Sequence, residues 1–350
     1  MVDPPKFKLE PLSYKLSDKL SERSKELGNP MRISAPMVRY SKLPFRELLR
    51  LYSTEICYTP MMLSDSFTKS QKYRDLEYSV PPTYSTIDRP VIAQFAATDP
   101  VEFAQSALLV YSRGASGIDL NCGCPQRWAW QEGIGCKTTA RKDWPEFIHD
   151  CVRMSKNLLP DNNFTISIKT RMLAENDRKG NDVDFNDTLT MLQNGEKAGV
   201  DFIGVHARTR HERNCEPHYE DAKKLVDLLE VPTIINGGFK SRKSCLKLFE
   251  DTPVAGLMVA QKILEDPDFW SENEVKRSEV VKNWYEISIN RQVDFKIFLH
   301  HLLFMLDKPY LDSEERDKMA KFTSFSEVTD YLYRSFRKKS FQTVSQASVV

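Results

Sequence analysis

Residues 118–125 read IDLNCGCP, a short apolar run that ends on Asn121 and is followed by a turn containing glycine and proline. Such a run, bounded by turn residues, is typical of a β-strand. The pattern recurs along the chain, and each run is followed by a polar or glycine-bearing junction and then by a stretch with helical periodicity. It predicts strands at residues 32–37, 56–61, 91–95, 118–121, 164–170, 202–206, 233–236 and 257–260.

Helical stretches with favourable N-terminal caps separate several of these strands. The clearest of them span 100–113, 186–198 and 242–250, and their capping residues are Asp99, Asn186 and Ser241. Eight strand–helix units over about 245 residues match the usual size of a (β/α)8 TIM barrel. The chain is therefore predicted to belong to the α/β class.

Periodicity alone cannot distinguish a closed barrel from a doubly wound open sheet, so the strand ends decide between them. Six of the predicted strands end on, or just before, a polar group that could act on a ligand. In a barrel these ends would meet at one mouth, where active sites lie. The residues are Gln94, Asn121, Lys169, His206, Asn236 and Gln261.

After about residue 275 the glycines stop and apolar residues recur at three- and four-residue spacing. Two helical stretches are predicted there, 284–306 and 313–336, separated by a segment with Pro309. The pattern indicates a smaller C-terminal all-helical domain. The predicted organisation is an N-terminal extension (1–28), a catalytic barrel (29–275), a helical domain (276–342) and a tail (343–350).

Composition places the chain among ordinary globular proteins and sets limits on its partners. Of 350 residues, 50 are Lys or Arg and 49 are Asp or Glu, so any nucleic acid must bind through local patches. The longest apolar stretch, 254–260, is far shorter than the about 20 residues that span a bilayer. No signal or transit peptide is recognised, which predicts a cytoplasmic or nuclear location, and no obligate protein partner is evident.

Cys124 stands in the densest polar motif, and its neighbours Gly123 and Pro125 would hold the thiol in a fixed turn. A zinc site built with Cys122 and Cys136 is disfavoured because no fourth ligand has suitable spacing, so no metal is predicted. The thiol could instead act as a nucleophile or serve as a general acid. The cysteines expected to be buried structural groups are Cys57, Cys151 and Cys245.

Two further strand ends carry groups that suit a charged ring. A lysine such as Lys169 at the end of a buried strand needs an anion or solvent, and His206 could be a hydrogen-bonding or a core histidine. The Gly237-Gly238 pair offers backbone N–H groups for a phosphate. No P-loop or Rossmann fingerprint occurs. Together these residues favour a barrel enzyme with a phosphate-bearing ring cofactor such as a flavin.

The motifs resemble those of the tRNA-dihydrouridine synthase family and follow the family's order from about residue 32 to 261. The phrases QFAATDP (94–100) and NCGCPQRWA (121–129) are most similar to the eukaryotic type 4 branch, which acts on uridines 20a and 20b of the tRNA D-loop. The other matching motifs are Ala35-Pro36-Met37, Tyr58-Thr59-Pro60-Met61, Lys169-Thr170-Arg171, His206-Ala207-Arg208 and Asn236-Gly237-Gly238.

This resemblance implies an FMN- and NAD(P)H-dependent oxidoreductase that reduces the C5–C6 double bond of D-loop uridines in tRNA, with NADPH or NADH as reductant and Cys124 as proton donor. The helical domain would help to bind tRNA. Substrate contacts are assigned to Asn121, Arg171 and Arg208. The implied FMN contacts are Pro36, Met37, Val38, Gln94, Lys169, His206, Asn236, Gly237, Gly238, Ala260 and Gln261.

The chain departs from the family pattern at Ala260-Gln261, where many members have Gly-Arg, so a bidentate phosphate partner is missing. The alternative enzyme is an FMN barrel dehydrogenase of a small pyrimidine or enone, and a further alternative is a catalytically silent tRNA-binding barrel. With a net charge of +1, a tRNA enzyme must concentrate its cations. They are predicted at the mouth (Arg208, Arg210, Arg213) and near the C-terminus (Arg334, Arg337, Lys338, Lys339).

Overall fold

A computed structural model describes residues 14–78, 88–175 and 183–338. The predicted tail and the first residues of the predicted N-terminal extension lie outside this described part. No helix within it combines the length and apolar character needed to cross a membrane.

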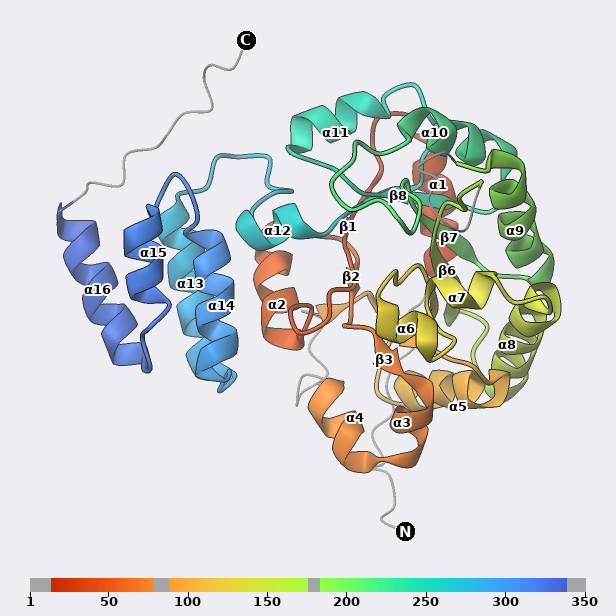
Figure 1. Ribbon diagram of the computed structural model, residues 1–350, viewed down its shortest axis with the longest axis horizontal. Helices are drawn as coiled ribbons and strands as arrows, with labels where there is room; N and C mark the ends of the chain where they lie inside the picture. The colour runs from red at the N-terminus through yellow and green to blue at the C-terminus, as the bar shows by residue number, and fades with distance from the viewer. Residues whose placement is uncertain (1–13, 79–87, 176–182, 339–350) are drawn as a thin grey trace.

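The strands form a closed parallel ring, confirming the predicted TIM barrel (Figure 1). Their order around the ring is β1-β9-β8-β7-β6-β5-β4-β2, and β3 pairs with β4 outside this path. Ile33 and Ile56 close the ring through a parallel bridge, and the Ser34 N–H donates to the Ile56 carbonyl at 3.0 Å. The open-sheet alternative is therefore wrong. The strands are β1 (Met31–Ser34), β2 (Cys57–Tyr58), β3 (Met62–Leu63), β4 (Val91–Ala96), β5 (Gly117–Cys122), β6 (Thr165–Arg171), β7 (Phe202–His206), β8 (Thr233–Asn236) and β9 (Gly256–Val259).

The predicted strand 56–61 is the one that differs most from the structure, because it is divided into β2 and β3. Pro60 has no backbone N–H to donate to a neighbouring strand, so the ladder stops there. The Thr59 hydroxyl donates to the Pro60 carbonyl at 2.9 Å and accepts from the Gln94 N–H at 3.1 Å. This interruption places Thr59 beside a predicted cofactor residue.

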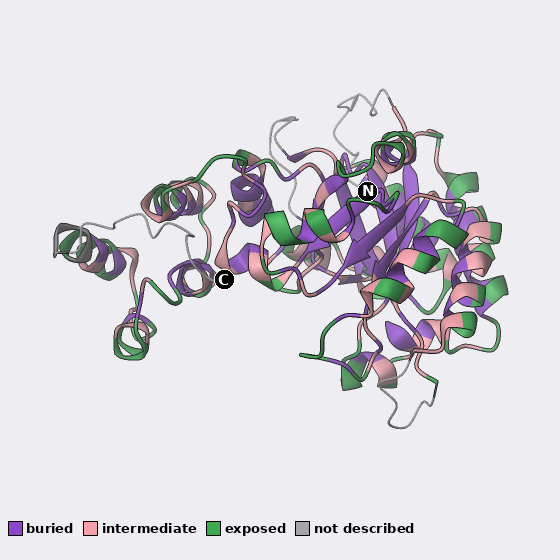
Figure 2. Cartoon of the chain, turned by 90° about the horizontal axis from the view of Figure 1, so that it is seen from above, coloured by how far each residue is buried: buried purple, intermediate pink, exposed green. Residues whose placement is uncertain are grey.

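Helices surround the ring, with buried faces toward the strands and exposed faces outward (Figure 2). Asp99 and Ser241 cap their helices as predicted, whereas the second predicted cap is Asp184 rather than Asn186. The helices α3 and α4 were not predicted from the sequence. The helices are α2 (Leu43–Leu51), α3 (Ser64–Lys69), α4 (Gln71–Glu77), α5 (Pro100–Tyr111), α6 (Arg127–Gln131), α7 (Cys136–Thr139), α8 (Trp144–Leu158), α9 (Phe185–Ala198), α10 (Tyr219–Leu228), α11 (Arg242–Leu248) and α12 (Gln261–Glu265).

Helix α1 (Leu16–Lys25) covers the N-terminal end of the barrel. Leu16 and Leu20, one helical turn apart, are fully buried in the cluster that includes Phe202 from β7. Lys15 pairs with Asp201, directly before β7. The first part of the chain therefore closes the end of the barrel opposite the mouth and is not merely a lead-in to β1.

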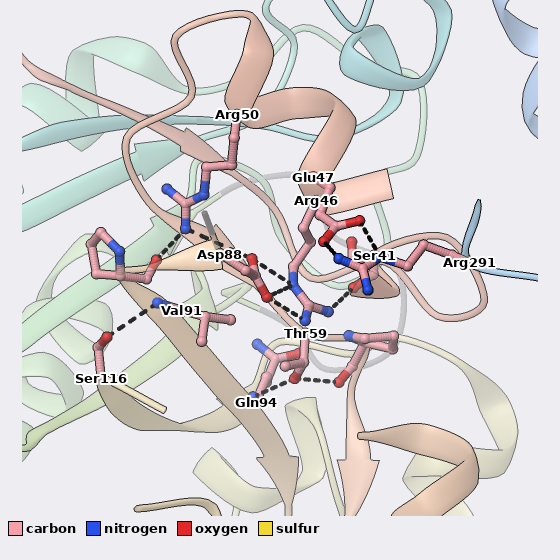
Figure 3. Close-up of polar contacts among 12 residues, drawn as sticks. Ser41, Arg46, Glu47, Arg50, Thr59, Asp88, Val91, Gln94, Ser116 and Arg291 are labelled. Atoms are coloured by element: carbon pink, nitrogen blue, oxygen red, sulfur yellow. Dashed lines mark hydrogen bonds and ion pairs between the residues drawn. The ribbon is translucent and has the colours of Figure 1, made fainter. Parts of the chain in front are cut away.

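The C-terminal helices lie together beside α2 and α12 (Figure 1). Trp284 and Phe45 from α2 contact edge to face with ring centroids 6.2 Å apart, and Arg291 forms an ion pair with Glu47 (Figure 3). Each of the two predicted helical stretches is divided; in the first, the chain turns at Gln292 and Asp294 caps the next helix. The four helices are α13 (Arg277–Asn290), α14 (Phe295–Met305), α15 (Ser313–Met319) and α16 (Phe325–Lys338).

Candidate active site

The carboxyl ends of the strands bring most of the predicted site residues to one mouth. A cavity of about 550 Å³ lies over the ends of β7, β8 and β9, within the roughly 300–1,000 Å³ range of small-molecule sites. The predicted residues in its lining are His206, Arg208, Asn236, Gly237, Gly238, Ala260 and Gln261. Hydrogen bonds connect further predicted residues to this group or to one another.

Gln94 is held in the barrel interior by a fixed set of partners. Its amide nitrogen donates to Asp119 Oδ2 at 2.9 Å, and its amide oxygen accepts from Asn121 Nδ2 at 2.8 Å. The other Asp119 oxygen accepts from the Ser167 hydroxyl at 2.6 Å. The network sets which end of the Gln94 amide faces each neighbour, and it brings together the ends of β4 and β5, as predicted.

Asp119 is a buried carboxylate, and burial raises its pKa from 3.8 to about 6. The folded chain therefore takes up a proton at a higher pH than the unfolded chain. Above pH 6 the ionised, buried carboxylate lowers the free energy of unfolding by its full amount. As the pH falls from 6 toward 3.8 the group becomes protonated in the folded chain, and this loss of stability disappears.

Asp119→Asn is expected to remove this pH dependence. Between pH 4.5 and 7.5 the free energy of unfolding of the unmodified protein should fall by about 2 kcal/mol relative to the variant. Urea denaturation at both pH values measures this double difference. Asp143→Asn is the matched control, because Arg141 lowers the pKa of Asp143. Relative to this control, the free energy of unfolding of the unmodified protein should rise, not fall, as the pH increases. Equal slopes for Asp119→Asn and the unmodified protein would contradict the prediction.

The Cys124 turn is fixed from two sides. Asn121 Oδ1 accepts from the N–H groups of Gly123 at 3.2 Å and Cys124 at 3.0 Å. The Cys124 carbonyl accepts from the Cys136 N–H at 3.1 Å. Gly135 has a φ of +65°, and a Cβ there would lie 2.5 Å from the Cys124 carbonyl oxygen. These contacts fix the backbone that carries the thiol, as the glycine and proline in the motif suggested.

Cys124 differs from its two neighbouring cysteines in exposure. Cys122 and Cys136 are 1% and 8% exposed, whereas Cys124 is only half-buried. Burial raises the pKa of the Cys124 thiol, although the nearby Gln126 N–H, Arg171 and Lys169 oppose this effect. Cys124 is therefore an accessible thiol that stays protonated at neutral pH, the state required of a general acid. Within the described residues, no group of three metal-binding side chains occurs.

Lys169 on β6 and Asn236 on β8 meet over the intervening strand β7. Lys169 Nζ donates to Asn236 Oδ1 at 3.0 Å, and Asn236 Nδ2 donates to the Met258 carbonyl at 2.7 Å. Burial, together with Arg171, lowers the pKa of Lys169 to about 8. No carboxylate forms an ion pair with Lys169 in the described part of the chain, so an anion bound beside it would stabilise its charge.

His206 is neutral and has a defined tautomer. Arg208 Nη1 lies 3.2 Å from His206 Nε2, and because arginine cannot accept, the ring nitrogen accepts and the proton is on Nδ1. Burial first, then Arg171, Lys169 and Arg208, lower the pKa of His206 well below 6.5. Arg171 donates to the carbonyls of Thr209 at 2.8 Å and Glu212 at 3.2 Å, so it supports the β7–α10 loop.

Pro36, Met37 and Val38 lie on the β1–α2 loop and do not line the described cavity. The Ser41 hydroxyl accepts from the Met37 N–H at 3.0 Å and donates to the Ala35 carbonyl at 2.9 Å. Arg46 donates to the Ser41 carbonyl at 2.8 Å (Figure 3). The loop begins beside the cavity, because the Ala35 N–H donates to the Val259 carbonyl at 2.8 Å.

Gly237 and Gly238 form a backbone cradle that admits no side chain. Their φ values are +117° and +71°, a region that favours glycine. A Cβ at Gly237 would lie 2.6 Å from the His206 ring, and one at Gly238 would lie 2.5 Å from Pro217. The glycines therefore let the backbone pack closely against His206 and Pro217 while it lines the cavity.

The sequence motifs did not indicate roles for Asp119, Ser167 or Thr59. An aspartate within an otherwise apolar strand was the available signal for Asp119, because a buried carboxylate requires hydrogen-bond donors. No local signal distinguished the hydroxyl of Ser167 or Thr59, since only the barrel brings them to Asp119 and Gln94.

The comparison with a family model settles the relationship. The dihydrouridine synthase (Dus) model matches residues 33–348. This chain belongs to the dihydrouridine synthase family. The resemblance predicted from the motifs is confirmed.

Named relatives point to one branch of the family. The mouse "tRNA-dihydrouridine(20a/20b) synthase [NAD(P)+]-like" protein is 37% identical over 305 residues, covering 87% of this chain and 89% of the relative. The Schizosaccharomyces pombe tRNA-dihydrouridine(20a/20b) synthase is 37% identical over 308 residues, covering 88% of each. The rat tRNA-dihydrouridine(16/17) synthase-like protein is 30% identical over 249 residues, covering 70% of this chain and 52% of the relative. The predicted likeness to the type 4 branch is confirmed.

Solved structures with a similar barrel are more distant. The old yellow enzyme of Trypanosoma cruzi aligns with a TM-score of 0.46 and 9% identity, covering 73% of this chain and 93% of that structure. A homologue from Zymomonas mobilis gives a TM-score of 0.48 and 8% identity, with 73% and 92% coverage.

Proposed function

We propose that this protein is a tRNA-dihydrouridine synthase that reduces the C5–C6 double bond of uridines 20a and 20b in the D-loop, using FMN and NADPH or NADH. The observation that carries the proposal is the accessible, protonated Cys124 thiol at the same barrel mouth as Lys169 and the Gly237-Gly238 cradle. Family membership and the 20a/20b names of the relatives support the substrate.

The residues present fit a flavin mononucleotide. Gly237 and Gly238 line the cavity, where their backbone N–H groups could contact a phosphate, and cationic side chains line the same cavity. Lys169 is a partly buried cation whose hydrogen-bond acceptor, Asn236, carries no charge. Bound FMN, reduced by NADPH or NADH, would supply the hydride for C6 of the uracil.

The protein residues would orient the reactants and move one proton. Lys169 would stabilise negative charge on the ring, and the fixed Gln94 amide and neutral His206 would offer hydrogen bonds to its edge. Hydride addition at C6 leaves an electron pair at C5, and the Cys124 S–H would donate its proton there. The resulting thiolate recovers a proton from water. Asn121, which was predicted to contact the uracil, positions the Cys124 turn and donates to Gln94.

The surface beside Cys124 favours an RNA substrate over the small pyrimidine or enone of the alternative enzyme. Trp128, four residues after the thiol, is 44% exposed, and Arg210 lies 3.7 Å from the ring centroid of neighbouring Trp130. An exposed aromatic ring on a surface that also carries cationic side chains is typical of sites on which unpaired bases stack. Extrusion of the target uridine would bring such bases to the mouth.

The C-terminal basic cluster remains a prediction for tRNA binding. Arg334 lies near the end of α16 and is exposed. The side chains of Arg337 and Lys338, and the whole of Lys339, lie outside the described residues. The cytoplasmic or nuclear location also remains a prediction.

The test combines three measurements on the purified full chain. We expect a yellow protein, or one that turns yellow with added FMN. It should oxidise NADPH and form dihydrouridine at positions 20a and 20b of an unmodified tRNA transcript. A protein that binds no FMN would overturn the proposal. NADPH oxidation driven by small enones, with no product in tRNA, would favour the alternative dehydrogenase instead.

A further inference from the structure

The β9–α12 side of the cavity offers no free cation for a phosphate among the described residues. Gln261 replaces the arginine expected from the family pattern, and its amide donates to Glu265 at 3.3 Å. Lys262 forms ion pairs with Glu265 at 3.2 Å and Asp266 at 2.7 Å. A dianionic group bound here would therefore need its positive partner from another wall.

Another part of the lining, formed by the β7–α10 loop, carries two arginines, Arg208 and Arg213. No carboxylate lies within ion-pairing distance of either one in the part of the chain that the structure describes. Lys240, also in the lining, pairs with Glu216 at 2.9 Å. Arg208 and Arg213 are thus the cations of this cavity whose charge is not already matched by a neighbouring carboxylate.

Arg208 is oriented before any ligand binds. Its Nε donates to the Cys215 carbonyl at 2.8 Å, and its Nη1 donates to His206 Nε2 at 3.2 Å. These bonds leave both Nη2 protons and one Nη1 proton for a ligand. A Cβ built on Gly237 would lie 3.6 Å from Nη1, so the guanidinium adjoins the glycine cradle. A guanidinium fixed in this way, with N–H groups still free, is well suited to bidentate phosphate recognition.

Given the proposed function, on which this rests, we infer that Arg208 and Arg213 hold the phosphate monoester of the flavin cofactor. The β7–α10 loop thereby supplies the charge that position 261 lacks. Arg208 was predicted as a uracil contact. Under the present inference it is assigned to the phosphate of the cofactor instead.

The test compares FMN with riboflavin, which lacks only the phosphate, by fluorescence titration of the flavin-free full chain. The unmodified protein should bind FMN at least about tenfold more tightly than riboflavin, the effect of one charge-assisted hydrogen bond. Arg208→Gln and Arg213→Gln should each lower this preference severalfold. Arg213→Gln, which leaves the Arg208–His206 contact in place, should also leave the dissociation constant of riboflavin unchanged. Lys247→Gln on α11, which removes the same charge outside the cavity, should not change the preference.

A rescue variant separates charge placement from loop damage. Adding Gln261→Arg to Arg208→Gln should restore the FMN preference, because it returns an arginine to the other wall. If both arginine variants keep the full preference, the phosphate is held elsewhere and the inference is wrong. If the unmodified protein binds neither flavin, the proposed function fails instead. If Arg208→Gln does not fold, loss or retention of the preference in Arg213→Gln decides the outcome.

Discussion

Cys124→Ala is expected to lower dihydrouridine formation by about 10²- to 10⁴-fold, the usual contribution of a positioned general acid. FMN binding and NADPH oxidation should remain, because the thiol donates a proton to the substrate and is not needed to reduce the flavin. Single-turnover product formation on a tRNA transcript, measured beside stopped-flow flavin reduction, separates the two half-reactions.

Cys136→Ala is the matched control for this variant. Its thiol is 8% exposed, and burial raises its pKa to about 11, so it should be a poor proton donor to a bound base. The control should therefore keep most of its product yield. Unchanged product formation in Cys124→Ala would remove Cys124 from the proton-transfer step. Equal losses in both variants would indicate that the turn, rather than the thiol, is responsible.

Asp88→Ala should lower the free energy of unfolding by about 3–5 kcal/mol, the usual effect of removing one partner of a buried ion pair. Arg46 and Asp88 are 2% and 3% exposed, and Arg46 Nη2 donates to Asp88 Oδ2 at 2.7 Å (Figure 3). The variant leaves a desolvated guanidinium without its carboxylate. Urea denaturation monitored by tryptophan fluorescence measures the loss.

The same substitution should weaken FMN binding if the β1–α2 loop contacts the cofactor. Arg46 holds the Ser41 carbonyl, and the Ser41 hydroxyl holds the loop at Met37, so a displaced guanidinium would loosen it. Asp143→Ala, which removes the exposed partner of Arg141, is the control and should leave the denaturation midpoint nearly unchanged. A similarly small effect from Asp88→Ala would show that the buried pair contributes little.

Local patterns in the sequence predicted the barrel because each strand carries its own signal. Runs such as 164–170 and 233–236 are apolar, β-branched and ended by polar or glycine residues, and they differ from β6 and β8 by at most one residue. The same local character explains the errors. Pro60 divides one predicted strand, and α1 was not anticipated because its burial of Leu16 and Leu20 depends on the distant barrel end.

The candidate site also combines features that the sequence motifs indicated with features that only the folded barrel shows. The motifs around Cys124, Lys169 and Gly237 were recognisable because their residue types and spacing lie within single strand ends. The exposure that distinguishes Cys124 from Cys122 and Cys136 depends on how the folded chain packs around each thiol, and it has no counterpart in the motif.

The sequence by itself determined the order of the strands, the family and the residue types at the barrel mouth, since these depend on neighbours along the chain. Only the tertiary structure decided which polar partner each charged side chain has. Asp119 meets Ser167 and Gln94, and Lys169 meets Asn236, across segments far apart in the chain. Electrostatic interactions depend on distance and burial. The arginines that have no carboxylate partner, and could therefore bind a phosphate, can be identified only in the folded barrel.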